Sequence, residues 1–104
     1  MTIGGWTDGG ACLTVATEGC ELTAGCGHGQ FPRPIVRADG TFEADGTYRI
    51  EVGPVGISPA PPAHFSGVVD GSTLTLKVVP AGEGLMPASY TMRRTSVPGC
   101  PRCL

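Results

Sequence analysis

Five cysteines are the residues of this 104-residue chain that most clearly indicate a chemical role, and they lie at positions 12, 20, 26, 100 and 103. Because their number is odd, they cannot all pair within one chain. In a reducing compartment, clustered cysteines indicate a metal site or a reactive thiol more often than a disulfide framework. The cysteines therefore predict metal ligation first and disulfides second.

Cys26 and His28 form the first pair of candidate ligands. If one strand runs from Leu22 through Ala24 to His28, both side chains share its apolar, inward face, since alternate residues of a strand point the same way. Thiolate and imidazole are ligands that zinc binds at about 2.0–2.3 Å. The alternative for His28 is a hydrogen-bonded core histidine.

Cys100 and Cys103 form the second pair, in a C-x-x-C spacing that presents two thiolates to one ion. Added to Cys26 and His28, they complete a Cys3His set, which is a tetrahedral zinc environment. A redox-active disulfide is the alternative, but the βαβ context that supports it is missing. Disulfides between Cys12 and Cys20, or between Cys20 and Cys26, are also open.

Two further residues are candidates for proton transfer beside a metal-bound water. His64 and Asp8 are predicted to assist there, against the simpler readings of a rim histidine and a turn-capping aspartate. Arg93 and Arg94 have the charge to hold an anionic ligand, yet adjacent strand residues face opposite ways, so at most one reaches a given pocket. Trp6 is expected to plug one end of the fold.

The elements that position these residues are strands separated by turns. The chain has 17 glycines and 10 prolines, which interrupt every candidate helix, and no window shows a 3.6-residue apolar period. Asp-Gly pairs mark several turns. We therefore predict one domain over residues 1–104, an all-β, up-and-down antiparallel β-barrel of about eight short strands. The candidate strands are 13–17, 21–24, 28–31, 35–37, 41–43, 47–52, 63–69, 72–79 and 88–94.

Charge and hydropathy exclude several functional classes. The formal net charge is -2 and Lys77 is the only lysine, which argues against nucleic-acid binding. No stretch approaches the ~20 apolar residues that span a bilayer. The first residues show neither the basic nor the apolar region of a secretory signal. A cytoplasmic protein without nucleic-acid or membrane partners is expected.

Motifs spread along the chain, among them Trp6 and residues 26–29, 39–42, 46–49 and 103–104, carry a family resemblance. On these motifs the chain resembles a group of short bacterial all-β barrel proteins of unassigned function. In those relatives a histidine stands four positions after the tryptophan, where this chain has Gly10, and the early histidine, a mid-chain cysteine and a terminal cysteine look like three metal ligands. The resemblance implies that Cys12 replaces that histidine beside Cys26 and Cys103. It runs almost end to end and rests on Trp6, 13–15, 26–29, 34–36, 39–42, 46–49, 53–54, 67–71, 74–76 and 103–104.

Three functions follow from these residues. Zinc with four protein ligands is structural, whereas zinc with three ligands and a water generates a hydroxide nucleophile for an ester or phosphoester. The third is a lipocalin-like barrel that binds a small molecule, with the cysteines in disulfides. The sequence favours the zinc-binding barrel with hydrolase activity and a small-molecule substrate.

Overall fold

The computed structural model describes residues 1–8, 10–25, 27–50, 61–81 and 86–95. These residues form eight strands, and no helix occurs among them. The strands are β1 (Gly4–Thr7), β2 (Cys12–Ala16), β3 (Gly19–Ala24), β4 (Gly27–Phe31), β5 (Thr41–Ile50), β6 (Pro62–Asp70), β7 (Thr73–Pro80) and β8 (Ala88–Thr95).

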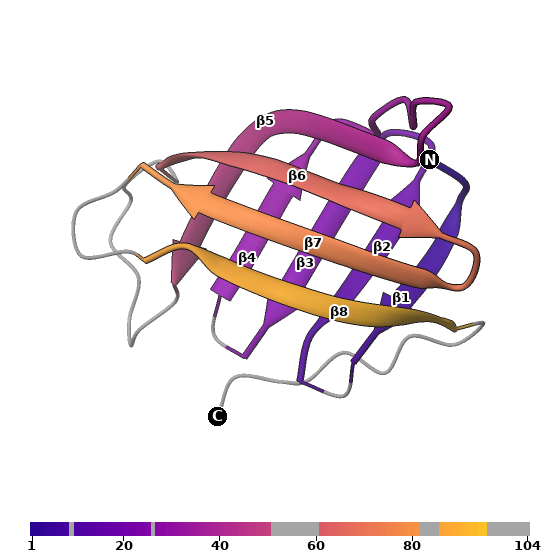
Figure 1. Cartoon of the computed structure of the whole chain (residues 1–104). Helices are drawn as coiled ribbons and strands as arrows, with labels where there is room; N and C mark the ends of the chain where they lie inside the picture. Colours follow the sequence, from indigo (N-terminus) through magenta and orange to yellow (C-terminus); the bar gives the residue numbers. More distant parts are fainter. Residues whose placement is uncertain (9, 26, 51–60, 82–85, 96–104) are drawn as a thin grey trace.

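The strands close into an up-and-down antiparallel barrel, as the sequence predicts. Each strand pairs with the next one in the chain, and β1 pairs with β8 through Gly5–Thr95, Trp6–Arg94 and Thr7–Arg93. In Figure 1, β6, β7 and β8 cross over β1 to β4 at a steep angle. Closure leaves no exposed sheet edge, which suits a chain with few charged residues.

β5 differs from the prediction, which placed a turn at Asp45 and Gly46. The chain instead continues as one ten-residue strand that pairs with β6 up to Thr47 and with β4 from Thr47 onward. Gly46 lies at this change of partner, where an added Cβ would overlap the carbonyl oxygen of Gln30. A glycine at a barrel corner allows such a close approach of two backbones.

The predicted strand at residues 35–37 is also wrong. These residues belong to an irregular connection between β4 and β5, and Ile35 is 88% exposed. Pro32 and Pro34 flank the start of this segment, and each lacks the N–H that a ladder needs. Asp39 and Gly40 do form the predicted turn before β5.

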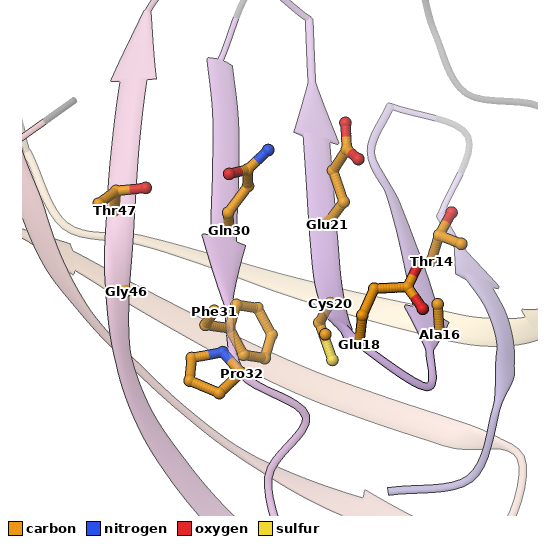
Figure 2. Close-up of a pocket in the computed structure, with 11 residues that line it drawn as sticks. Thr14, Ala16, Glu18, Cys20, Glu21, Gln30, Phe31, Pro32, Gly46 and Thr47 are labelled. Carbon is orange, nitrogen blue, oxygen red and sulfur yellow. The ribbon is translucent and has the colours of Figure 1, made fainter. Parts of the chain in front are cut away.

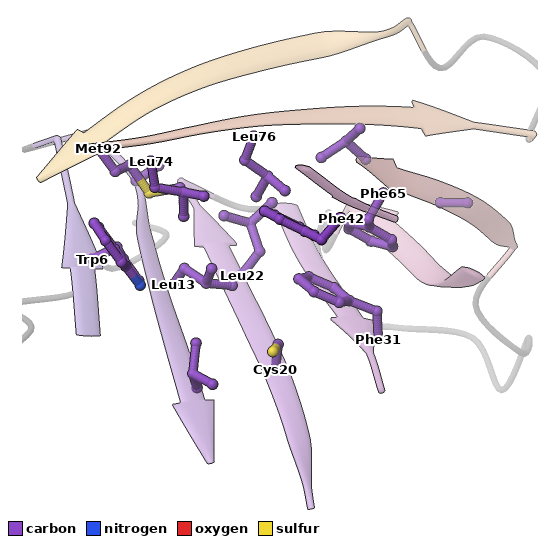
Figure 3. Close-up of a cluster of buried hydrophobic side chains, with 14 residues drawn as sticks. Trp6, Leu13, Cys20, Leu22, Phe31, Phe42, Phe65, Leu74, Leu76 and Met92 are labelled. Carbon is purple, nitrogen blue, oxygen red and sulfur yellow. The ribbon is translucent and has the colours of Figure 1, made fainter. Parts of the chain in front are cut away.

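The barrel interior is an apolar core. Strand β7 shows the predicted alternation, with Leu74, Leu76 and Val78 buried. Phe31 and Phe65 stack with their ring centroids 4.4 Å apart. No polar or charged residue is buried among the described residues. The buried core in Figure 3 comprises Trp6, Ala11, Leu13, Val15, Cys20, Leu22, Phe31, Phe42, Ala63, Phe65, Leu74, Leu76, Val78 and Met92.

The up-and-down order places alternate connections at the same end of the barrel. The β2–β3, β4–β5 and β6–β7 connections lie at one end, where β1 also begins and β8 ends. We call this the Trp6 end. At the opposite end, β1, β3, β5 and β7 end and β2, β4, β6 and β8 begin. Within the described ranges, no helix is long and apolar enough to cross a membrane.

Candidate functional site

His28 lies on the outer face of the barrel, not on the inner face that the sequence predicts. The buried positions of β4 are Gly27, Gly29 and Phe31, and Gly27 pairs with Ala24 across a tight turn. Directly paired residues of neighbouring strands share a face. The prediction failed because it continued one strand from Leu22 to His28. The chain instead begins a new strand at Gly27, and Gly27, as the partner of Ala24, takes the inner face and leaves His28 on the outer face.

Cys12 is disulfide-bonded. In this form its sulfur is not a thiolate and cannot bind zinc as one. Its side chain is fully buried, although strand alternation points it to the face opposite that of the core residues Leu13 and Val15. Cys12 is thus a structural cross-link in this state, which corrects the expectation that it ligates zinc. Cys20 is a free, buried thiol, so both predicted disulfides through Cys20 are wrong.

The remaining predicted ligands, Cys26, Cys100 and Cys103, lie outside the described residues. Within the part of the chain that is described, no group of three or more His, Cys, Asp or Glu side chains is placed to hold a metal ion. Zinc binding at these cysteines stays a prediction.

Asp8 and His64, the two predicted proton-transfer residues, occupy different settings. The Oδ1 atom of Asp8 accepts hydrogen bonds from the backbone N–H groups of Gly10 and Ala11, at 2.7 and 2.6 Å. Asp8 therefore caps the β1–β2 turn, which was the simpler reading. His64 lies on β6, directly opposite Asp45 on β5.

His64 belongs to an exposed charged network on the outer face. Its Nδ1 lies 2.8 Å from Asp45 Oδ1 and its Nε2 lies 3.4 Å from Glu43 Oε2. Glu43 Oε1 also accepts a hydrogen bond from Arg37 at 2.8 Å. The hydrogen bond to Asp45 is the main reason that the pKa of His64 is raised above its ordinary value of 6.5. Both ring nitrogens face carboxylates, so the network stabilises the imidazolium.

The network predicts a small pH dependence that Asp45→Asn removes. A raised folded-state pKa stabilises the fold fully below about pH 6.5, and this contribution is lost as the pH rises through the folded-state pKa. NMR titration should show a lower pKa for His64 in Asp45→Asn. Asp70 lies on β6, about 20 Å along that strand from His64, so Asp70→Asn should leave the pKa of His64 unchanged. An unaltered titration in Asp45→Asn would contradict the assignment.

A groove of about 600 Å³ lies near the Trp6 end, on the outside of β2 to β5 (Figure 2). A continuous cross-strand row of Thr14, Glu21, Gln30 and Thr47 forms its polar side. Cys20 is also among its lining residues, but burial raises the pKa of this thiol to about 11. Cys20 is therefore protonated at neutral pH, and the groove has no imidazole to activate it.

A second cavity of about 520 Å³ lies at the Trp6 end itself. It is bounded by the residues before β1, the β4–β5 connection and the ends of β6 and β8. Its polar groups are two guanidinium groups, the Trp6 indole, the Thr2 hydroxyl and the N-terminal ammonium of Met1, which donates a hydrogen bond of 2.7 Å to the Pro34 carbonyl oxygen. The rest of the lining is apolar. Its lining residues are Met1, Thr2, Trp6, Arg33, Pro34, Ile35, Val36, Val69 and Arg94.

Trp6 and Arg94 form the inner wall of this cavity. They are direct partners across the β1–β8 ladder, and the Arg94 Cζ atom lies 5.4 Å from the Trp6 ring centroid. Arg94 Nη2 donates a hydrogen bond of 3.3 Å to the carbonyl oxygen of Ile3. Arg93 does not line the cavity, which confirms that only one of the two adjacent arginines reaches it.

The indole nitrogen of Trp6 is the orphan polar atom of this site. Trp6 is 1% exposed, and its Nε1 is buried with no hydrogen-bond partner among the described residues. An unsatisfied buried donor costs about 1–3 kcal/mol, and such groups call for a functional or structural explanation.

Sequence reasoning singled out Trp6 and Arg94 separately but did not join them, and it missed Arg33. The strand alternation places Arg94 on the face of Met92, which is buried. Only the closure of β8 onto β1 brings this face over Trp6. Arg33 stands in an irregular segment, where no periodicity indicates the direction of a side chain.

Comparisons with protein-family models, with curated proteins and with solved structures found no match to this chain.

Proposed function

We propose that this protein is a small-ligand-binding β-barrel that acts without catalysis, and that its ligand occupies the cavity at the Trp6 end. The observation that carries the proposal is a cavity of about 520 Å³ lined by Arg33, Arg94 and Trp6, in which neither guanidinium has an ion-pair partner among the described residues. Small-molecule sites have this order of size, with mostly apolar walls and a few polar groups that orient the ligand.

The polar groups near the cavities favour binding over catalysis. Arg33, Arg94 and Trp6 are donors, and the lining adds only the Thr2 hydroxyl and the Met1 ammonium to them, with no His, Cys, Asp or Glu side chain. Cys20, which lines the other groove, has a thiol, but burial raises the pKa of this thiol and keeps it protonated. The described residues provide no ligand set for the zinc-dependent hydrolase predicted from the cysteines. That hydrolase is therefore the weaker of the two proposals.

The disulfide at Cys12 bears on where the protein works. Structural disulfides persist in oxidising compartments and are rare in the cytosol. We therefore propose that the protein works in an oxidising compartment, in place of the cytoplasm expected from the sequence.

Titration with three six-carbon compounds tests the proposal. The chain has one tryptophan, Trp6, so its fluorescence reports directly on the cavity. At least one of hexanoate, 1-hexanol and hexylammonium should bind saturably, one molecule per chain, by calorimetry and by Trp6 emission. EDTA should leave this binding unchanged. The absence of saturable binding, or stoichiometric zinc whose removal abolishes it, would overturn the proposal.

A pair of adjacent valines localises the binding. Val69 lines the cavity, whereas Val68 faces the outside and is 42% exposed. Val69→Phe should fill the cavity and weaken binding by about tenfold or more, on the order of 1.4 kcal/mol. Val68→Phe adds the same volume outside and should change nothing. Thermal melts of both variants establish that they fold. Wild-type affinity in folded Val69→Phe would exclude this cavity.

A further inference from the structure

We infer that the cavity at the Trp6 end selects a ligand with one carboxylate-type anionic group and a short apolar body, held at its charged end by Arg33 and Arg94. This inference rests on the proposed binding function and adds the chemical class of the ligand. It is carried by three independent features of the lining: its charge, the way Arg94 is held, and its apolar surface.

The cavity is positive in a protein that is negative overall. Its lining includes Arg33 and Arg94 and no carboxylate, although the chain has a formal net charge of -2. In the described part of the molecule, neither arginine forms an ion pair, whereas Arg37 is paired with Glu43. Two guanidinium groups without a counter-charge at one concave site attract an anion.

Arg94 is pre-positioned for such a ligand. Its guanidinium lies over the Trp6 ring and donates to the Ile3 carbonyl oxygen, and these contacts use only one of its side-chain N–H donors. A planar fork with free donors matches the two oxygens of a carboxylate.

The rest of the lining calls for an apolar body. Pro34, Val36 and Val69 line the cavity, and Val36 and Val69 also pack against the core. Ile35 stands at the same cavity with 88% of its surface exposed. A short hydrocarbon chain would cover this side chain and remove apolar surface from water. An inorganic anion alone would leave this apolar lining uncovered.

The same three probes test the class of ligand. Hexanoate, 1-hexanol and hexylammonium share one apolar body and differ in the charge of the head. We expect hexanoate to bind at least about tenfold more tightly than 1-hexanol, and hexylammonium to bind most weakly. Equal affinities for hexanoate and 1-hexanol would overturn the inference while leaving the proposed function in place. No saturable binding of any probe would instead overturn the proposed function.

Three arginine variants assign the charge to its residue. Arg33→Gln should weaken hexanoate about tenfold and leave 1-hexanol unchanged, and Arg33→Lys should restore most of the difference. Arg93→Gln removes the same charge from a strand position outside the cavity and should leave both affinities unchanged. Equal weakening in Arg93→Gln and Arg33→Gln would show a general charge effect and overturn the assignment. Arg33→Gln with unchanged selectivity would do the same.

Discussion

Reduction of the disulfide at Cys12 is expected to lower the free energy of unfolding by about 2–4 kcal/mol. The cross-link restricts the unfolded chain, and its loss leaves a thiol at a fully buried position. Urea denaturation with and without reductant measures the difference. A count of free thiols in denaturant should find at most three of the five cysteines before reduction, because one disulfide contains two.

The second described cysteine supplies the control. Cys20 is free, so Cys20→Ala should keep the full response to reductant. Cys12→Ala should be less stable than the wild type and should respond less to reductant. If all five thiols react before reduction, or if reductant leaves the denaturation midpoint unmoved, the disulfide assignment is wrong.

Gly46→Ala is expected to destabilise the barrel by about 2–3 kcal/mol, the upper part of the range for overpacking. The new Cβ would overlap the backbone carbonyl oxygen of Gln30, and it would lie 2.8 Å from Cβ of Phe31. Gln30 and Phe31 both belong to β4, which pairs with β5 and lies beside Gly46 in Figure 2. The corner of β5 can accept the methyl group only by moving away from β4.

Gly10→Ala is the matched control for this substitution. A Cβ at Gly10 would meet only Asp8 Oδ1, at an ordinary 3.6 Å. The same change in chain entropy should therefore leave stability unchanged or raise it slightly. Urea denaturation of both variants gives the comparison. Equal stability of Gly46→Ala and Gly10→Ala would show that β5 is not tightly apposed to β4.

The sequence predicts the barrel well because its turns and alternation are local signals. Asp70 and Gly71 join two strands whose inward residues, such as Leu76, follow a strict two-residue period. The seam between β1 and β8 is different, since it depends on residues about 90 positions apart. Trp6 was predicted to plug an end, and the structure adds that it belongs to a strand.

The errors share one physical origin, which is that alternation does not survive a change of direction. His28 was placed inside because no strong turn signal separates it from Leu22. Asp45 and Gly46 gave the opposite error, since a typical turn pair sits within a continuous, bent strand. Gly46 serves close backbone approach there, a requirement that its neighbours in the sequence do not reveal.

The candidate site lay furthest beyond sequence reasoning. The choice between metal and disulfide at Cys12 depends on which atoms approach its sulfur in the fold, and spacing leaves both open. Arg33 and Arg94 are about 60 positions apart, and only the β4–β5 connection and the barrel seam bring them to one cavity. The cysteines attracted attention by their number, whereas the unpaired arginines could be recognised only by what surrounds them.

The pairing of the first strand with the last also sets a timetable for synthesis. β1 ends at Thr7 and its partner β8 begins at Ala88, so a ribosome working at 5–20 residues per second takes about 4–16 s to make the chain between them. Throughout that interval the nascent sheet has an open side, and the indole of Trp6 lacks its stacking partner. A factor that shields β1 until β8 emerges would raise the yield of native protein.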